Sequence, residues 1–262
     1  MVTAPKLILL DLDGTLYVGQ EPIPGAVFAV QQLRESGIPL RFLTNTTTKS
    51  QAQLVAQMHG LGFELKSEEL ISAPGAARLE LHRLQRQLGR TIRIWPVVAE
   101  AIKADFNEFD LDESAPDYIV LGDIGAAWSL ALINRLFNAM YQGAELIALH
   151  KNRFWQTEAG LKADIGFFVA GLEYLCSKNA RIMGKPNPEF FQSVLTSTGV
   201  AAADTLMVGD DIDTDIGGAQ QMGMKGALVK TGKYREAYCA ESRVKPDLVL
   251  DSIADLMANM SA

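Results

Sequence analysis

Short runs of apolar residues alternate with longer stretches of helical periodicity along the chain. Residues 7–10 form a continuous apolar run, residues 26–36 repeat apolar positions with the period of a helix, and residues 40–43 form the next apolar run. This alternation is typical of β-α-β units, in which buried parallel strands are joined by helices. The pattern predicts an α/β fold built on a Rossmann-like parallel sheet.

The last third of the chain repeats this alternation. Apolar runs at residues 206–208, 226–229 and 248–250 predict three further strands, and residues 213–222 have the period of a helix. We expect these strands to complete the sheet that the first part of the chain begins.

The middle of the chain predicts a second α/β unit inserted into the first. Turn formers and small residues cluster at residues 72–75 and 177–181, which mark the two ends of the insert. We therefore predict a core of residues 1–75 and 181–262 and an insert of residues 76–180. The expected strands of the insert are residues 92–98, 118–121 and 146–149, and its expected helices are residues 99–106 and 129–141.

Composition narrows the range of partners. The 262 residues carry a formal net charge of -7, so the chain lacks the excess of Lys and Arg that a nucleic-acid binder needs, although a local site for a small anion is compatible with it. The first apolar run ends at Asp11, too early for a signal sequence or a membrane span. We therefore expect a cytoplasmic protein with no membrane partner. Cys176 and Cys239 have neither metal-ligand spacing nor the density of a disulfide framework.

Two carboxylates follow the first predicted strand. Asp11 and Asp13 stand in the run Asp-Leu-Asp-Gly-Thr, at the carboxyl end of a strand, where open α/β sheets bind their ligands. One acid can attack a phosphoryl group while the other transfers protons, and the acyl phosphate formed on the first is readily hydrolysed. The alternative is a capped turn, since Asp-Gly pairs commonly form turns.

Two further segments offer groups that could bind a phosphate. Thr44 and Asn45 follow another predicted strand and supply a hydroxyl and an amide, although a Thr-Asn pair also caps helices. Lys185 stands in a Gly-Lys-Pro turn that would hold its charge in place, whereas most lysines are simply exposed to solvent.

An acidic cluster follows the strand predicted at residues 206–208. Asp210, Asp211, Asp213 and Asp215 lie within six positions, and four carboxylates this close repel one another unless cations compensate. A hard divalent ion with oxygen ligands is the natural compensation. Asp213 is the member most readily assigned to helix capping or to solvent.

Taken in order, these four segments resemble the four motifs of the haloacid dehalogenase superfamily. The resemblance extends over the whole chain, and the insert is similar to the class IIA cap of the NagD-like group. It implies a magnesium-dependent phosphatase that hydrolyses a small phosphorylated metabolite through an aspartyl phosphate, and it suggests a homodimer formed through the cap. The residues that carry it are Asp11, Asp13 and Thr15, then Thr44 and Asn45, then Lys185, and finally Gly209, Asp210, Asp211 and Asp215.

The resemblance also implies catalytic roles. Asp11 corresponds to the nucleophile and Asp13 to the general acid and base. Thr44 and Lys185 correspond to the pair that binds the substrate phosphate, and Asn45 is grouped with them. Lys185 also counts among the catalytic residues, because a fixed positive charge offsets the repulsion between an anionic nucleophile and an anionic phosphate.

The metal ligands follow from the same resemblance. Asp11, the main-chain carbonyl of Asp13 and Asp210 correspond to the protein ligands of the ion, and Asp211 and Asp215 to residues that orient the groups around it. Mg²⁺ is the implied ion, because it is usually held by one or two carboxylates together with a substrate phosphate.

A mixed cationic and aromatic segment lies in the insert. It contains His150, Lys151, Asn152, Arg153 and Trp155, directly after a predicted strand. One interpretation is a loop that recognises the leaving group of the substrate, since a cap over the ligand edge of a sheet selects substrates. The other is an exposed strand end of mixed polarity, and the spacing does not decide between them.

Two alternative functions stay open at this point. A phosphotransferase or phosphomutase would use the same residues and pass the phosphate to a second substrate in place of water. A non-catalytic phosphate-binding module would be built on the same kind of sheet. The sequence does not identify the substrate.

Overall fold

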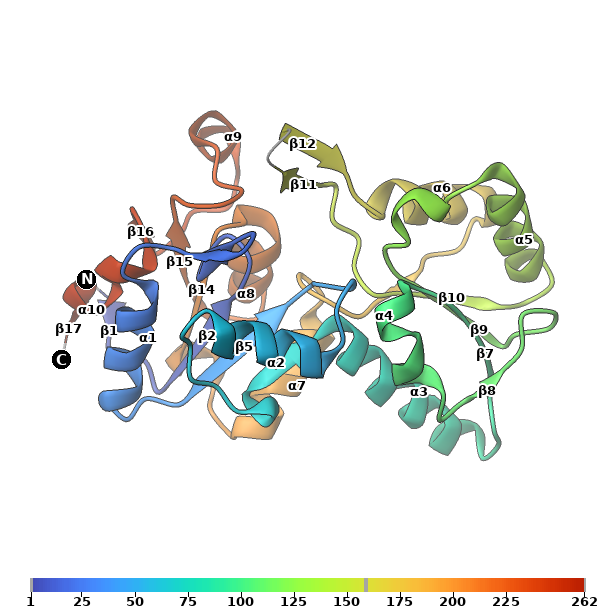
Figure 1. Ribbon diagram of the computed structural model, residues 1–262, viewed down its shortest axis with the longest axis horizontal. Coiled ribbons are helices and arrows are strands. Elements are labelled where there is room, and N and C mark those ends of the chain that lie inside the picture. The colour runs from blue at the N-terminus through green and yellow to red at the C-terminus, as the bar shows by residue number, and fades with distance from the viewer. Residues whose placement is uncertain (1, 158–159, 262) are drawn as a thin grey trace. The chain divides into compact units, whose positions relative to one another are not determined.

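The computed structural model describes residues 2–157 and 160–261 (Figure 1), and the chain forms two compact units. The first unit comprises Met1–Thr44, Ala52–Ile71 and Lys185–Ala262, and the second comprises Asn45–Gln51 and Ser72–Gly184. The insert predicted at residues 76–180 lies within the second unit. Both units combine a parallel sheet with helices, which confirms the predicted α/β fold.

The first unit is built on a six-stranded sheet. The neighbouring strands β16 (Leu248–Leu250) and β15 (Lys225–Val229), β15 and β14 (Thr205–Gly209), β14 and β2 (Leu7–Asp11), and β2 and β5 (Leu40–Thr44) are parallel pairs. Because parallel strands end at one edge of the sheet, the segments that follow β2, β5, β14 and β15 leave it at neighbouring points. The strand order is β16 (Leu248–Leu250), β15 (Lys225–Val229), β14 (Thr205–Gly209), β2 (Leu7–Asp11), β5 (Leu40–Thr44) and β6 (Leu70–Ser72).

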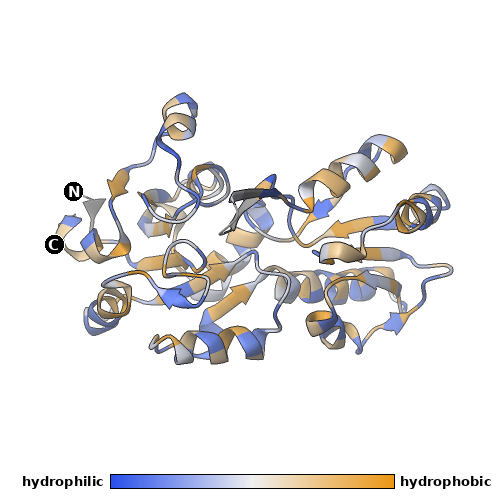
Figure 2. Ribbon diagram, turned by 45° about the horizontal axis from the view of Figure 1, so that its top comes forward, coloured by the Kyte–Doolittle hydropathy of each residue, from blue (hydrophilic) through white to orange (hydrophobic). Residues whose placement is uncertain are grey.

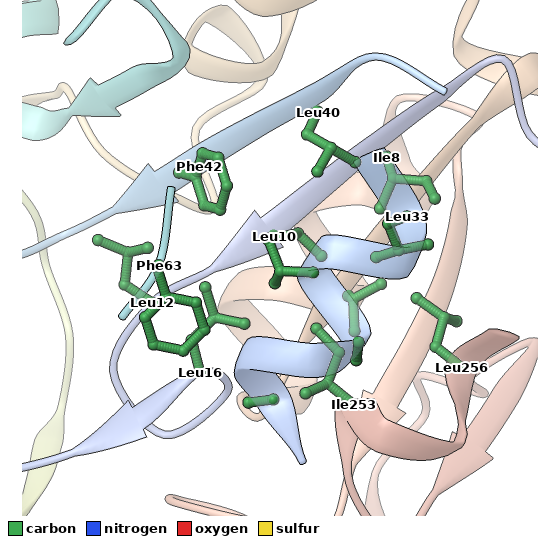
Figure 3. Close-up of a cluster of buried hydrophobic side chains, with 14 of the residues drawn as sticks. Ile8, Leu10, Leu12, Leu16, Leu33, Leu40, Phe42, Phe63, Ile253 and Leu256 are labelled. Carbon is green, nitrogen blue, oxygen red and sulfur yellow. The ribbon is translucent and has the colours of Figure 1, made fainter. Parts of the chain in front are cut away.

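The hydrophobic core of the first unit explains why residues 7–10 form a strand without polar positions. All four are fully buried, and successive side chains of a strand point to opposite faces of the sheet. Figure 3 shows Ile8 and Leu10 gathered with Leu33 of α1 (Ala26–Glu35) and with Phe42 of β5. Burying each such side chain contributes about 1.5–3 kcal/mol to folding.

The other elements of the first unit are short. The helix predicted at residues 213–222 forms in two pieces, a π-helical turn η5 (Ile212–Gly217) followed by α8 (Gly218–Gln221). The remaining helices are α2 (Gln51–Gly60), η1 (Ser67–Glu69), α7 (Pro188–Thr198), η4 (Ala202–Asp204), α9 (Glu236–Glu241), η6 (Ile253–Asp255) and α10 (Leu256–Asn259), and the short strand pairs are β1 (Val2–Thr3) with β17 (Met260–Ser261) and β3 (Tyr17–Val18) with β4 (Glu21–Pro22).

The second unit has its own five-stranded sheet with parallel neighbours throughout. Alternate residues of its strands enter two separate apolar clusters. Ile94 and Val120 pack with Leu81 of α3 (Ala73–Leu88), whereas Trp95 and Ile119 pack with residues of α5 (Leu130–Tyr141) and α6 (Gly166–Cys176). Figure 2 shows the corresponding apolar strands as orange arrows. The strand order is β13 (Arg181–Ile182), β10 (Glu145–Ala148), β9 (Tyr118–Leu121), β7 (Arg93–Val97) and β8 (Asp110–Leu111).

Two features of the second unit differ from the sequence prediction. The prediction of a turn at residues 72–75 was wrong, because α3 begins there. The side chain of Ser72 caps this helix by accepting a hydrogen bond from the N–H of Gly75 at 3.2 Å. Pro74 fits this first turn, where its missing N–H has no helical partner to lose.

An antiparallel hairpin that the pattern did not predict follows β10. It consists of β11 (Phe154–Thr157) and β12 (Gly160–Ala163).

The remaining helices of the second unit lie on the segments between its strands. Within residues 2–157 and 160–261, no helix is both long and apolar enough to cross a bilayer. These helices are α4 (Glu100–Lys103), η2 (Ala104–Phe106), η3 (Gly125–Ala127), α5 (Leu130–Tyr141) and α6 (Gly166–Cys176).

Candidate active site

Three carboxylates meet at the carboxyl edge of the first sheet. Asp11 is the last residue of β2, Asp210 follows β14 directly, and Asp215 lies in η5. Strands β2 and β14 are neighbours in the sheet, so residues almost 200 positions apart arrive at one place. Ligand oxygens of the three side chains lie within 4.8 Å of one another, and all three residues are buried.

Lys185 is a buried cation within this cluster. Its side chain is only 2% exposed, its ammonium forms an ion pair with Asp11, and Nζ lies 2.8 Å from Oδ1 of Asp215. Nζ also donates to the carbonyl of Leu43 at 3.3 Å. Burial alone would lower the pKa of Lys185, but the charges of Asp11 and Asp215 outweigh it and raise that pKa above its usual value. The lysine is therefore a buried charge and not the solvent-exposed one that its residue type would favour.

The carboxylates carry more negative charge than one lysine neutralises. Burial, followed by the charges of Asp11 and Asp215, raises the pKa of Asp210 well above its usual value. Burial also raises the pKa of Asp215 to about 7, against the opposing charge of Lys185. Burial and the neighbouring carboxylates thus oppose ionisation of both Asp210 and Asp215, and a bound cation would counter both effects.

The donor set fits a hard divalent cation. Carboxylate oxygens are the ligands such ions prefer, and three of them converge here. Oδ1 of Asp215 is buried and lies 2.8 Å from the Lys185 ammonium.

Local backbone geometry explains how Asp215 reaches the cluster. Its carboxylate lies against Gly209, and a side chain at that position would collide with it. Oδ2 of Asp215 accepts the N–H of Asp211 at 3.1 Å. The carboxylate of Asp211 in turn caps η5, because it accepts the N–H groups of Asp213 and Thr214 at 3.1 Å each.

The segment after β2 surrounds Asp11 with polar groups. Oγ1 of Thr15, which is fully buried, donates to Oδ2 of Asp11 at 3.2 Å. Asp13 is exposed, unlike Asp11, and is therefore accessible to a substrate. Burial, then the charges of Asp13 and Asp11, raises the pKa of Tyr17, so the phenol stays protonated. Thr44, at the end of β5, is buried.

Sequence reasoning missed one segment of the site, Thr231–Lys233 after β15. Oγ1 of Thr231 donates to the carbonyl of Gly14 at 2.5 Å, and the N–H of Lys233 donates to Oδ2 of Asp210 at 2.6 Å. The sequence contained a usable signal: β15 was predicted to be a strand, and the segment after it ends at the same sheet edge as Asp11 and Asp210.

Comparison with known proteins places this geometry in a family. A model of the haloacid dehalogenase-like hydrolases matches residues 8–112, and a model described as HAD-hydrolase-like matches residues 182–256. The human phospholysine phosphohistidine inorganic pyrophosphate phosphatase is 36% identical over 254 residues, which cover 95% of this chain and 91% of the relative. The chain belongs to the haloacid dehalogenase-like hydrolases.

Further relatives agree with this assignment. Haloacid dehalogenase-like hydrolase domain-containing protein 2 of Bos taurus is 36% identical over 243 residues, covering 93% of this chain and 90% of the relative. The 4-nitrophenylphosphatase of Thermotoga maritima superposes on this hydrolase with a TM-score of 0.88 at 23% identity, over 98% of both chains, and shows the shared fold. The predicted family is confirmed, and so is the prediction of an enzyme at the level of a phosphatase of this family.

A structure of glycerol phosphate phosphatase from Mycobacterium tuberculosis, in complex with magnesium, is also similar. Its TM-score is 0.81 at 28% identity, and the alignment covers 97% of this chain and 76% of that one. Its magnesium is a property of that protein.

The second unit of the hydrolase brings together some of the residues predicted to recognise the substrate. His150 and Asn152 are buried, and the N–H of Asn152 lies 3.3 Å from Nδ1 of His150. Asn45, which was predicted to bind phosphate, donates through Nδ2 to Oδ1 of Asn152 at 3.2 Å. Nε2 of His150 lies 3.9 Å from Oδ1 of Asp164. This partly buried polar network joins Asn45 to the predicted recognition segment.

The other members of that segment differ in their surroundings. Lys151 forms an ion pair with Glu173 of α6 at 2.5 Å, and Arg153 is exposed. The side chain of Trp155 lies outside the described residues. Both cations of the segment, Lys151 and Arg153, lie at exposed positions.

Proposed function

We propose that this hydrolase is a magnesium-dependent phosphatase that hydrolyses a small phosphorylated metabolite through an aspartyl phosphate on Asp11. The observation that carries the proposal is the buried cluster of Asp11, Asp210 and Asp215 with Lys185 in contact. A structural ion pair needs one carboxylate for one lysine. An excess of buried acid costs stability unless a ligand or cation compensates for it.

Asp11 is the nucleophile in this proposal. Its carboxylate attacks the phosphorus, the bond to the leaving oxygen breaks, and an acyl phosphate forms that water then hydrolyses. Thr15 and Lys185 fix the carboxylate in place. Lys185 and Thr44 would bind the phosphoryl oxygens, with Asn45 as a further candidate. Phosphoryl transfer depends mainly on such positioning and on charge.

Asp13 is the proton donor in this proposal. It gives a proton to the departing alkoxide and takes one from the water that attacks the acyl phosphate. Its exposure supports the assignment, since the group that serves the leaving oxygen must be reached by the substrate. An acid at residue 13 also argues against a dehalogenase, because a halide leaving group does not need a proton.

Mg²⁺ is the proposed cation. Asp11, the main-chain carbonyl of Asp13 and Asp210 would hold it, with Asp211 and Asp215 orienting the groups around them. Bound there, the ion would neutralise charge on the transferring phosphoryl group. The magnesium complex of the similar glycerol phosphate phosphatase supports this choice.

The second unit is proposed to act as the cap that selects the substrate, with residues 76–180 as its boundaries. The network of Asn45, His150 and Asn152 and the exposed Arg153 are the candidates for contacts with the leaving group. Small phosphorylated molecules are the proposed substrates. The phosphohistidine and glycerol phosphate named for the relatives belong to this class of compound.

The test is an assay of phosphate release from p-nitrophenyl phosphate by purified protein. We expect release that requires Mg²⁺, stops with EDTA and returns with added Mg²⁺. Phosphate transfer to an added alcohol in place of water would favour the phosphotransferase. If the protein binds inorganic phosphate but hydrolyses no member of a panel of phosphometabolites, the proposed enzyme activity is refuted.

A further inference from the structure

Lys233 contacts two carboxylates of the site with two different groups. Its N–H donates to Oδ2 of Asp210 at 2.6 Å, and its Nζ lies 3.3 Å from Oδ2 of Asp211. The side chain is 20% exposed, the same fraction as that of Asp211. Lys233 therefore lies where it can affect both the geometry and the charge of the acidic cluster.

The main chain of this segment is fixed by close packing against the site. Gly232 has φ of 53° and Gly14 has φ of 90°, both in the left-handed region that favours glycine. A side chain at either position would collide with the carboxylate of Asp210. Together with the hydrogen bond from Thr231 to Gly14, this packing leaves the N–H of Lys233 one orientation, toward Asp210.

The charges of these carboxylates and the lysines that contact them do not balance within the described part of the chain. Four carboxylates, those of Asp11, Asp210, Asp211 and Asp215, face two ammonium groups, those of Lys185 and Lys233. Two negative charges remain when all four acids are ionised, which is the charge that one divalent cation neutralises. Lys185 serves Asp11 and Asp215, so Lys233 is the cation on the other side of the cluster.

We infer that Lys233 is a positioning and charge-balancing residue: its main chain orients Asp210, and its ammonium neutralises Asp211, so that the remaining charge matches a divalent cation. The inference deepens the proposed function and rests on its claim that a cation binds here. The charges of Asp211 and Asp210 outweigh burial and raise the pKa of Lys233, so its side chain stays charged.

The inference predicts that removing the side-chain charge of Lys233 strengthens cation binding. Lys233→Met keeps the main-chain hydrogen bond to Asp210 and removes one positive charge, so the site should bind cations more tightly. A residue that merely supported the fold would weaken binding when replaced. We expect the dissociation constant for Mg²⁺ to fall about threefold to tenfold, as about 1 kcal/mol of lost repulsion gives fivefold. The constant for Tb³⁺ should fall further, because the repulsion scales with the charge of the ion.

Isothermal titration with Mg²⁺, and luminescence titration with Tb³⁺, would measure these constants in the full chain. Lys233→Arg retains the charge and should bind like the wild type. Lys230→Met is the matched control: Lys230 lies three residues earlier and pairs with Asp251 at 2.9 Å with both side chains exposed, so its loss should leave the Mg²⁺ constant within about twofold, since surface charges are screened.

A reciprocal variant keeps the test decisive if Lys233→Met does not fold. Asp211→Asn retains an oxygen that can cap η5 and removes one negative charge, so it should weaken Mg²⁺ binding by a similar factor. The double variant Asp211→Asn, Lys233→Met should return to near the wild-type constant, because the two charges are lost together. Weaker or unchanged Mg²⁺ binding in folded Lys233→Met overturns the inference. So does a double variant whose dissociation constant differs clearly from that of the wild type.

Failure of the inference is distinguishable from failure of the proposed function. Wild-type protein that binds no Mg²⁺ and releases no phosphate refutes the proposed function itself. Wild-type protein that binds Mg²⁺ and releases phosphate, with an unchanged constant in Lys233→Met, refutes only the assignment of Lys233.

Discussion

The two sheets of this protein differ in how their charged residues are arranged. In the first unit, Asp11, Asp210 and Asp215 converge as buried like charges with one lysine among them. In the second unit, acids at the sheet pair with arginines near the surface. Asp117, for example, accepts hydrogen bonds from both terminal nitrogens of Arg90, at 2.9 Å each.

The difference separates two uses of ionisable residues. Paired, half-exposed charges contribute little and are tolerated on any sheet. Buried like charges cost stability, so they persist only where something else uses them. The two parallel sheets therefore differ in function because of the charges at their edges and not because of their topology. Four variants test this comparison.

Replacing the nucleophile should have the largest effect. Asp11→Asn retains the shape of the side chain but removes the attacking carboxylate, so kcat for phosphate release should fall more than about 10³-fold. A steady-state assay with excess p-nitrophenyl phosphate would measure it. The thermal midpoint without Mg²⁺ should stay the same or rise, since one buried like charge is lost. Activity above a few per cent of wild type would contradict the assignment.

Replacing the buried lysine should affect stability most. Lys185→Met leaves Asp11 and Asp215 without their cation, and removing one partner of a buried ion pair costs about 3–5 kcal/mol. Urea unfolding without Mg²⁺ would measure the loss, and saturating Mg²⁺ should recover part of it, since a ligand of the native state stabilises it. Lys230→Met, at an exposed pair, should cost less than about 0.5 kcal/mol. A loss below about 1 kcal/mol for Lys185→Met would show that the cluster does not depend on this charge.

Replacing a paired acid of the second unit should have a smaller effect that depends on pH. Hydrogen bonds from Arg90, opposed by burial and aided by the N–H of Arg93, lower the pKa of Asp117 below its usual value. A lowered folded-state pKa stabilises the protein above the unfolded pKa of about 4, and this contribution disappears as the pH falls through the folded value. Asp117→Asn should therefore cost about 1 kcal/mol at pH 7 and less near pH 3.

The matched control for Asp117 is Asp110→Asn, at an exposed carboxylate of β8 on the same sheet. It should change the free energy of unfolding by less than about 0.5 kcal/mol at either pH. Both variants should retain wild-type kcat. A pH-independent loss in Asp117→Asn would show that packing, and not charge, supports that position.

Replacing an exposed cation of the recognition segment should have the smallest effect. Arg153→Ala should raise KM for the preferred phosphometabolite about threefold, a loss near 0.6 kcal/mol, and leave kcat for p-nitrophenyl phosphate unchanged. Lys151→Ala is the control, because Lys151 is held by Glu173. Equal changes in both variants would contradict a specific role for Arg153.

Much of the first unit could be predicted from the sequence. The apolar runs gave the positions of β2, β5, β14 and β15 to within a residue or two, because strands buried on both faces contain no polar positions. The chemistry-bearing residues at their ends followed from the rule that parallel strands present ligands at one edge.

The parts that could not be predicted depend on contacts distant in sequence. Lys233 was overlooked although the strand before it was predicted, because the apolar pattern does not show that its N–H reaches Asp210. The pattern at residues 72–75 favoured a turn, since Ser, Pro and Gly also form turns; the same residues begin α3 because the side chain of Ser72 caps it. Asn45 was assigned to phosphate from its place after a predicted strand and from the family resemblance, and neither indicated its hydrogen bond to Asn152, which spans 107 positions.

Chemical trapping of the reaction intermediate tests the central claim most directly. Protein quenched with acid during turnover, reduced with borohydride and digested would be mapped by mass spectrometry. The account predicts reduction of the side chain of Asp11 alone, dependent on Mg²⁺ and substrate, because only an acyl phosphate is converted in this way. Turnover with an unmodified Asp11, or with modification at another carboxylate, would contradict it.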